Sequence, residues 1–212
     1  MSALAAAATT AGAPPETGSG ASARAIRVVG VSGSLHEPSR TTALVRLLLD
    51  KIAERAPAET TLIEVAALGP GFAGALTRDQ VGPEVEEALQ AIETADLLVV
   101  GSPVYRASFT GLFKHLFDFV GQYDLVGTPV LVAATGGGER HALILEHQLR
   151  PLFGFFQALT LPIGVYASNT DFTDYALTSP DVVRRVEQAV DRSLPIVEQA
   201  QRVRSSEYVS TW

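Results

Sequence analysis

The chain has 212 residues, of which 47% are hydrophobic and 18% charged, with a formal net charge of −7 at pH 7. This length suggests one domain with a substantial buried core, and the low charged fraction favours a subunit interface as well. Because the acidic balance includes no basic stretch, nucleic acid and anionic membrane surfaces are poor partners. The sequence contains no Cys, which excludes disulfides and thiolate metal sites and is compatible with a cytoplasmic protein.

Residues 1–25 are mostly Ala, Gly, Ser, Thr and Pro, and we expect them to form a disordered tail. A signal peptide would need a positive start and a strongly apolar centre, which residues 3–8 do not provide. The expected domain covers residues 26–202, and residues 203–212 form a polar C-terminal tail. No apolar run reaches the length that a membrane-spanning helix requires.

Between the tails, apolar strand-like runs alternate with helical periodicity, which is the pattern of a wound α/β sheet. Residues 97–100 are apolar without alternation, so helices should cover both faces of the sheet. We predict a flavodoxin-like three-layer sandwich with a five-stranded parallel sheet in the order 2-1-3-4-5, and a ligand at the carboxyl ends of its strands. The predicted strands are 26–31, 61–65, 97–102, 130–134 and 161–165. The predicted helices are 41–55, 83–95, 111–120, 140–157 and 180–201.

The segment after the first predicted strand combines glycines, hydroxyls and one arginine immediately before a helix. Gly30 and Gly33 would let the backbone turn and approach a ligand, while the helix start offers N–H groups and a positive dipole end to an anion. The side chains suited to a phosphate are those of Ser32, Ser34, Ser39, Arg40, Thr41 and Thr42. The alternative is an ordinary helix start, because Ser39 alone would make a good N-cap.

This loop does not fit two common nucleotide patterns. A dinucleotide-binding loop requires Gly-x-Gly-x-x-Gly, which is missing, and a triphosphate-binding loop requires a Lys, whereas Lys51 is the first in the chain. Side-chain hydroxyls instead suit the three oxygens of a terminal monophosphate. FMN is the common ligand of that kind on an open parallel sheet, so the sequence predicts an FMN site.

The loops after the third and fourth predicted strands end at the same sheet edge and should also contact the ligand. Pro103 fixes an extended backbone that presents Val104 and Tyr105 to a flat ring, and Arg106 would attract a phosphorylated nucleotide. A solvated loop with a packing Tyr is the alternative. After the fourth strand, small or absent side chains allow close backbone approach to a ring carbonyl. The loop after the fourth predicted strand consists of Thr135, Gly136, Gly137 and Gly138.

With three such loops in order, the sequence resembles the NADPH-dependent FMN reductase family, and within it the reductases of two-component alkanesulfonate and methanesulfonate monooxygenase systems. The resemblance covers about residues 26–201. It is carried by Gly33-Ser34 with Ser39-Arg40-Thr41-Thr42, by Ser102-Pro103-Val104-Tyr105 with Leu112, Lys114, Leu116 and Asp118, and by Ala134-Thr135-Gly136-Gly137. In that family the first loop holds the FMN phosphate and the other two hold the isoalloxazine, which implies the same roles here. His36 stands where members often carry Arg, and if neutral at pH 7 it implies a weaker, more pH-sensitive hold on the phosphate.

Pro151 lies inside the predicted helix 140–157, where its missing N–H should disturb the helix, and a π-bulge is one way to absorb that disturbance. The sulfonate-system reductases are similar in this segment and carry a π-helix at a subunit interface, with Tyr or His where this chain has His147. The resemblance therefore implies a homodimer or homotetramer with His147 at an interface. The alternative is a surface histidine before a plain proline kink.

The resemblance also implies hydride transfer from NADPH or NADH to FMN, and delivery of reduced FMN to a separate monooxygenase. Because the flavin supplies this chemistry, we expect no catalytic acid or base. We expect no metal site either, since His141 and His147 lie on different helix faces and no His-Glu-x-x-His pattern occurs. A Ser hydrolase is poorly supported because Gly-x-Ser-x-Gly is absent.

Two other functions remain open on the same fold. One is an enzyme that keeps FMN as a prosthetic group and reduces quinones, azo dyes or metal oxyanions. The other is a non-enzymatic electron carrier like flavodoxin, against which stand the greater chain length and the Arg in the phosphate loop. The flavin-to-protein ratio separates the first from a reductase that uses FMN as a substrate. An NADPH oxidation assay with free FMN separates the second.

Overall fold

The computed structural model describes residues 24–204. Most of both expected tails lies outside these residues, so the division into a domain at 26–202 and two tails stays a prediction. Arg24, in the expected N-terminal tail, donates two hydrogen bonds of 2.7 Å to the carboxylate of Asp96. Within the described range, no helix is both long enough and apolar enough to cross a membrane.

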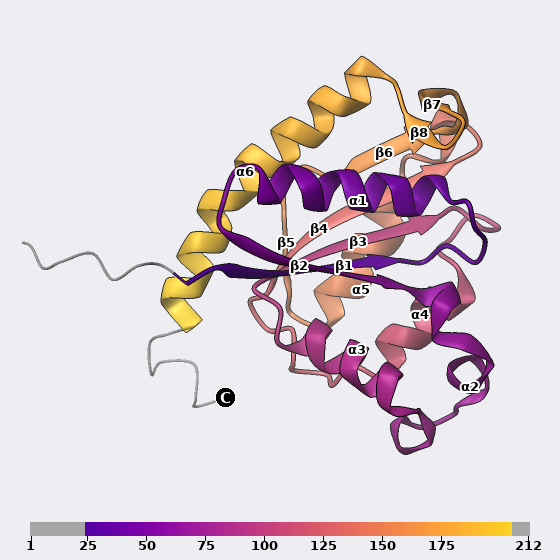
Figure 1. Cartoon of the computed structure of the whole chain (residues 1–212), viewed down its shortest axis with the longest axis vertical. Helices are drawn as coiled ribbons and strands as arrows, with labels where there is room; N and C mark the ends of the chain where they lie inside the picture. Colours follow the sequence, from indigo (N-terminus) through magenta and orange to yellow (C-terminus); the bar gives the residue numbers. More distant parts are fainter. Residues whose placement is uncertain (1–23, 205–212) are drawn as a thin grey trace, which may run out of the picture.

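A parallel sheet forms the middle layer, in the order β2-β1-β3-β4-β5, with β6 also paired to β4. Its four long strands are β1 (Ile26–Ser32), β2 (Ala58–Glu64), β3 (Leu97–Pro103) and β4 (Pro129–Gly136). The predicted flavodoxin-like strand order is thereby confirmed. Figure 1 shows these strands running in one direction, so that their carboxyl ends meet at one edge.

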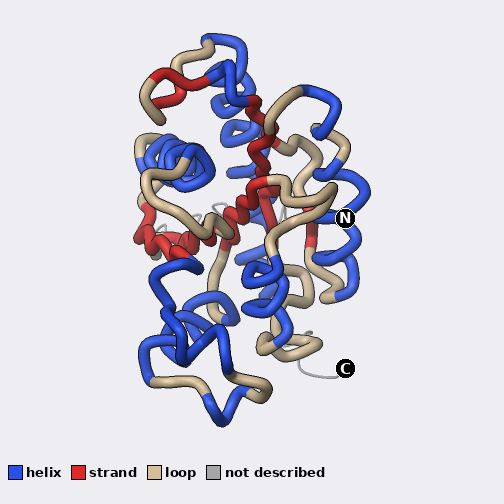
Figure 2. Tube along the Cα trace, turned by 90° about the vertical axis from the view of Figure 1, so that its right-hand side faces the viewer, coloured by secondary structure: helices blue, strands red, loops and turns tan. Residues whose placement is uncertain are grey.

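Helices pack on both faces of the sheet (Figures 1 and 2). One layer contains α1 (Arg40–Ala53) and α6 (Pro180–Arg204), and the other contains α3 (Pro83–Glu93), α4 (Gly111–Asp118) and α5 (Arg150–Phe155). Leu97 and Val99 of β3 belong to the core under α1, whereas Leu98 and Val100 belong to the core on the opposite face. The unbroken apolar run of β3 therefore reflects burial on both sides.

The fifth position of the sheet differs from the single strand predicted over residues 161–165. Two short strands, β5 (Leu159–Thr160) and β6 (Val165–Ser168), pair in turn with β4. Pro162 lies between them and has no N–H to donate to the ladder. Arg150 stabilises the break by donating to the carbonyls of Leu161 at 2.7 Å and of Pro162 at 3.0 Å.

The helix predicted over residues 140–157 is interrupted. A 3₁₀ turn (Glu139–His141) is followed by a π-helix (Leu145–Leu149), which continues directly into α5. Pro151, which has no N–H to donate, is the second residue of α5 and lies two residues beyond the end of the π-helix. The disturbance expected near Pro151 is therefore present as a π-helix immediately upstream of it.

The connection from β2 to α3 contains short helices that the sequence analysis did not predict. They are a 3₁₀ turn (Val65–Leu68), α2 (Gly69–Gly74) and a second 3₁₀ turn (Arg78–Gln80). Phe72 of α2 is buried, with its ring centroid 5.0 Å from that of His115 on α4. His115 Nε2 lies 3.1 Å from the Phe72 carbonyl oxygen, so this segment is packed against the domain.

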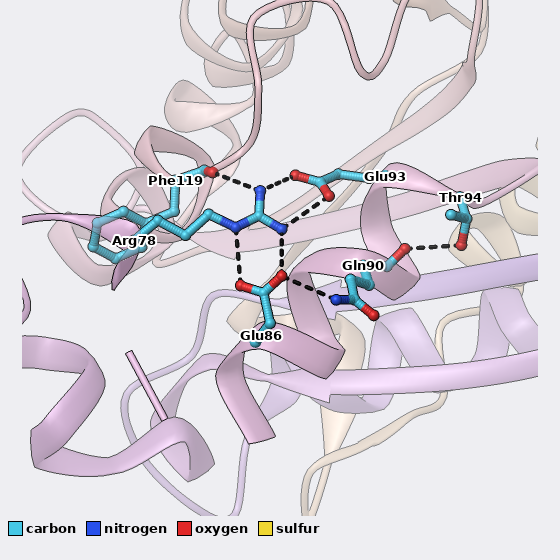
Figure 3. Close-up of polar contacts among 6 residues, drawn as sticks. All are labelled: Arg78, Glu86, Gln90, Glu93, Thr94 and Phe119. Carbon is cyan, nitrogen blue, oxygen red and sulfur yellow. Dashed lines mark hydrogen bonds and ion pairs between the residues drawn. The ribbon is translucent and has the colours of Figure 1, made fainter. Parts of the chain in front are cut away.

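Arg78 joins the same connection to α3 through the network in Figure 3. Its guanidinium donates to the two carboxylate oxygens of Glu86 at 2.9 and 2.8 Å, and it also pairs with Glu93. A weaker bond of 3.3 Å reaches the carbonyl of Phe119 at the end of α4. Hydrogen bonds from Arg78 and then Gln90 lower the pKa of Glu86 to about 2. One side chain thus connects α3, α4 and the loop between β2 and α3.

Candidate functional site

The loops that follow β1, β3 and β4 lie together at the carboxyl edge of the sheet. The Gly33 N–H donates to the Gly101 carbonyl at 2.7 Å, and the Val104 N–H donates to the Thr135 carbonyl at 2.8 Å. These backbone bonds connect the first loop to β3 and the loop after β3 to β4. The structure therefore places the three predicted loops side by side, at the edge where open α/β sheets bind ligands.

Ser39 begins α1 as its N-cap. Its backbone is extended, with φ −129° and ψ 124°, and its Oγ accepts a hydrogen bond from the Thr42 N–H. This is the helix-start role that was the alternative interpretation of Ser39. The cap also fixes the direction of the first turn, where a helix is most favourable for an anion.

The other hydroxyls of the first loop have partners within the protein. Ser32 and Thr42 are buried and their hydroxyl oxygens lie 2.8 Å apart, while Thr41 lies 2.6 Å from the hydroxyl of Thr135. Ser34 Oγ donates to the His36 carbonyl at 3.0 Å. Ser32, Thr41 and Thr42 therefore hold the loop in place through buried contacts, whereas Ser34 is partly exposed and His36 is exposed.

Arg40, the first residue of α1, combines a buried donor with an absence of acidic partners. Its Nε is buried and has no hydrogen-bond partner, and no carboxylate of the described residues forms an ion pair with its guanidinium. Its charged group contacts the ring of Tyr175, whose centroid lies 4.9 Å from Arg40 Cζ. Because it has no acidic partner among the described residues, the Arg40 guanidinium can donate hydrogen bonds to an external anion.

The glycines of the first loop are required for packing within the protein. A Cβ at Gly30 would lie 2.7 Å from Leu49 Cδ1, and a Cβ at Gly33 would lie 2.7 Å from Phe113 Cδ2. Neither glycine has a positive φ. Gly30 therefore leaves room for the close packing of α1 on β1, and Gly33 leaves room for the close packing of α4 on the loop.

The loop after β3 ends in a tight turn. Tyr105 and Ser108 exchange backbone hydrogen bonds of 2.7 and 2.9 Å, and between them Arg106 (φ 47°) and Ala107 (φ 70°) occupy the left-handed region. That region is unfavourable for residues other than Gly, and such strain is concentrated at functional sites. The turn follows the partly exposed Pro103 and Val104, and leaves the Tyr105 side chain 41% exposed.

The turn after β4 is held by Tyr166 of β6. Tyr166 Oη donates to the Gly138 carbonyl at 2.6 Å, and burial raises the pKa of this phenol. A Cβ at Gly136 would lie 2.4 Å from Tyr166 Oη, whereas a Cβ at Gly137 or Gly138 would meet nothing within 4 Å. Gly136 is therefore required by packing, and the next two glycines present open backbone.

The π-helix borders this edge. Gln148 accepts a hydrogen bond of 3.0 Å from Ser108 Oγ, which links the π-helix to the turn after β3. His147 is exposed and lines a pocket of about 180 Å³ with Val104 and Gln148 among others. Among residues 24–204, no three His, Asp or Glu side chains are grouped closely enough to hold a metal ion.

Three site residues were missed by the sequence analysis. Thr110 is buried and its Oγ1 donates to the Gly33 carbonyl at 2.7 Å, so it supports the first loop from the start of α4. Its position before a helical pattern was a usable N-cap signal. Tyr166 and Tyr175 had no such signal, because their partners come from distant segments.

The family model for NADPH-dependent FMN reductases matches residues 26–173. The chain is 51% identical over 173 residues to the NADH-dependent FMN reductase SfnF of Pseudomonas fluorescens, covering 82% of this chain and 92% of that one. It is 49% identical to an FMN reductase (NADPH) of Pseudomonas aeruginosa, covering 80% of this chain and 91% of that one.

Solved structures agree with these matches. An oxidoreductase from Corynebacterium diphtheriae superposes with a TM-score of 0.76 at 30% identity, covering 84% of this chain and 99% of that one. The apo form of the NADH:FMN oxidoreductase EMOB superposes with a TM-score of 0.71 at 29% identity, covering 80% and 89%. The three adjoining loops, the matched residues and these likenesses lead to one conclusion. The chain belongs to the NADPH-dependent FMN reductase family.

Proposed function

We propose that this protein is an NAD(P)H-dependent FMN reductase that delivers reduced FMN to a separate flavin-dependent monooxygenase. The observation that carries the proposal is Arg40. Its guanidinium lies at the N-terminus of α1, at the carboxyl edge of the sheet. Its Nε is buried without a hydrogen-bond partner, and no carboxylate of the described residues forms an ion pair with it. A terminal phosphate supplies the acceptor oxygens that this arrangement lacks.

The residues present fit an FMN phosphate and ring. Arg40, Ser34, His36 and Ser39 would face the phosphate, while the buried pairs made by Ser32, Thr41 and Thr42 hold that loop in shape. The ring would lie against open backbone and the tight turn, which are formed by Pro103, Val104, Tyr105, Thr135, Gly136, Gly137 and Gly138. When bound, FMN supplies the two-electron chemistry with the nicotinamide.

The protein itself orients the reactants and moves no proton in this proposal. Tyr105 is exposed at the strained turn and would stack on a flat ring, and Arg106 beside it would attract the phosphates of NADH or NADPH. Hydride transfer depends on holding the two rings face to face, which is a matter of positioning. We therefore assign no catalytic acid or base.

The destination of the reduced flavin is inferred from the resemblance to reductases of two-component sulfonate systems. For the same reason we propose a homodimer or homotetramer with the π-helix at a subunit interface, where the exposed His147 would be covered. We place the protein in the cytoplasm, which contains reduced nicotinamide nucleotides. In this proposal FMN is a substrate of the enzyme. Flavin that copurifies in a stoichiometric amount would instead identify a reductase that keeps FMN as a prosthetic group.

The decisive experiment follows NADH and NADPH oxidation with free FMN, FAD and riboflavin, and it measures the binding of FMN and riboflavin to wild-type protein and to Arg40→Ala. Loss of a charge-assisted phosphate contact should raise the FMN Kd by about ten- to a hundredfold and leave the riboflavin Kd unchanged. Arg55→Ala, at the other end of the first helical segment and paired with Asp191, is the matched control. Equal losses for FMN and riboflavin contradict the phosphate assignment, and absence of NAD(P)H oxidation with free FMN contradicts the reductase.

A further inference from the structure

A two-stranded hairpin covers the N-terminal end of α1. It consists of β7 (Phe172–Thr173) and β8 (Ala176–Leu177), paired antiparallel, and Figure 1 shows it beside α1 at the carboxyl edge of the sheet. The family match ends at residue 173. The turn of the hairpin, Asp174 and Tyr175, therefore lies just beyond the matched residues.

The base of this hairpin is firmly held. Asp171 Oδ2 accepts hydrogen bonds from the Ser168 N–H at 2.7 Å and from Ser168 Oγ at 2.8 Å. The Asp171 carbonyl accepts from the N–H groups of Thr178 and Ser179 at 2.9 and 3.1 Å. These bonds fix both ends of the hairpin at the end of β6.

The tip of the hairpin has an unfavourable backbone. Asp174 (φ 47°) and Tyr175 (φ 66°) both occupy the left-handed region, although neither is Gly. Two consecutive residues of this kind form a tight hairpin turn, and this backbone is unfavourable for residues other than Gly. A strained turn on a fixed base gives the Tyr175 side chain a defined direction.

That direction is toward Arg40. The Tyr175 ring is 40% exposed, so it contributes little to the core, and its centroid lies 4.9 Å from Arg40 Cζ. At this distance the face of the ring attracts a guanidinium. Without the ring, Arg40 would regain rotamers directed into the adjoining groove, whose lining includes Glu37 and Glu64.

We propose that Tyr175 is a positioning residue that holds the Arg40 guanidinium for the terminal phosphate of the flavin, and so favours FMN over riboflavin. The inference rests on the proposed FMN reductase function. It assigns Tyr175 no contact with reacting atoms. The expected effect is on the affinity for FMN, which carries the phosphate, and not on the affinity for riboflavin, which lacks it.

The experiment titrates FMN and riboflavin into the full-length protein and follows quenching of flavin fluorescence. Tyr175→Ala should raise the FMN Kd about three- to tenfold, as expected for loss of a cation–π contact, and should leave the riboflavin Kd unchanged. Tyr175→Phe keeps the ring and should match wild type. Tyr175→Leu keeps apolar bulk without the ring electrons, should behave like Tyr175→Ala, and tests the idea even where the alanine variant is unstable. Tyr123→Ala, at another exposed tyrosine, is the control.

A double-mutant cycle with Arg40→Ala completes the test. If Tyr175 acts through Arg40, Tyr175→Ala should have no further effect on FMN affinity once Arg40 is removed. Additive losses, parallel losses for riboflavin, or wild-type affinity in Tyr175→Leu would each overturn the inference. If Arg40→Ala weakens FMN binding and Tyr175 variants do not, only this inference is wrong. If Arg40→Ala itself leaves FMN binding unchanged, the proposed phosphate site fails as well.

Discussion

The hydroxyl oxygens of Thr41 and Thr135 lie 2.6 Å apart, although the two residues are 94 positions apart in the chain. Both side chains are buried, with 2% and 5% of their surface exposed. The bond joins the first turn of α1 to the end of β4. It therefore fixes the spacing between the proposed phosphate loop and the proposed ring-binding turn.

Replacing both threonines should cost less than the sum of the two single replacements. Thr135→Val leaves the Thr41 hydroxyl buried without this partner, and we expect the free energy of unfolding to fall by about 1–3 kcal/mol. The double variant Thr41→Val with Thr135→Val removes both polar groups and should lose less than the sum of the single changes. Urea unfolding measures the cycle, with the exposed Thr60→Val as control. Strict additivity would show that the two hydroxyls do not stabilise each other.

Arg78→Ala should loosen the connection between β2 and α3. Removing the guanidinium leaves Glu86 and Glu93 without their shared partner, so we expect a lower free energy of unfolding than in wild type. Limited proteolysis should then cleave faster within residues 69–82. Arg55→Ala, which breaks an exposed ion pair with Asp191, should have little effect on either measurement. Equal behaviour of the two variants would reduce the Arg78 network to an ordinary surface contact.

Asp96 should make stability depend on pH. Burial acts to raise its pKa, but hydrogen bonds from the Arg24 side chain and the Arg27 backbone outweigh burial, so the pKa lies below its ordinary value of 3.8. A carboxyl with a lowered folded-state pKa stabilises the fold above its unfolded-state pKa, and that contribution disappears as the pH falls through the folded-state value. Asp96→Asn should therefore be less stable than wild type near neutral pH by about 1–3 kcal/mol. The gap, measured by urea unfolding, should shrink below about pH 4. A gap that stays constant down to about pH 3 would contradict this assignment.

Arg24 allows a second test with two shortened chains that differ by one residue. A chain that begins at Arg24 keeps the paired hydrogen bonds to Asp96, whereas a chain that begins at Ala25 loses them. Because Arg24 is largely exposed, the difference in unfolding free energy should be about 0.5–1 kcal/mol. Identical melting temperatures would show that Arg24 adds nothing to the domain.

His147→Glu should change the oligomer distribution. A buried, unpaired carboxylate at a subunit contact is costly, so light scattering should report a lower mean mass than for wild type. Gln188→Glu, on the exposed surface of α6, is the control. Unchanged mass would remove His147 from the proposed interface.

The strand order was predictable from sequence because it depends on apolar runs and helical periods, which are local patterns. The run Leu97–Val100 indicated burial on both faces, and Pro151 indicated a disturbed helix, since each effect lies in the residue itself. The split between β5 and β6 was missed because the apolar residues around Pro162 still resemble one strand. Its carbonyls are satisfied by Arg150, which only tertiary structure brings near.

The site was predictable to the level of loops and not of side-chain roles. Hydroxyls of Ser32, Thr41 and Thr42 resemble ligand donors in sequence, but their partners are set by packing between distant segments. The strained turns at Arg106 and Tyr175 were also missed, because Asn and Gly are the residues that normally signal left-handed backbone. Local sequence therefore predicted which loops lie together and left the supporting contacts unresolved.

Gly136 and Gly137 provide a final pair of variants that separates folding from flavin binding. A Cβ at Gly136 would lie 2.4 Å from Tyr166 Oη, so Gly136→Ala should displace Tyr166, break its bond to Gly138 and lower the melting temperature. A Cβ at Gly137 would meet nothing within 4 Å, and its φ is not positive. Gly137→Ala should therefore melt like wild type.

Gly137→Ala should impair flavin binding although it leaves the melting temperature unchanged. If the isoalloxazine lies against this turn, a methyl group at Gly137 should weaken FMN and riboflavin by the same factor, because both carry the ring. Arg40→Ala should weaken FMN alone. Gly137→Ala with wild-type affinity for both flavins would move the ring away from this turn, while leaving the phosphate assignment at Arg40 intact.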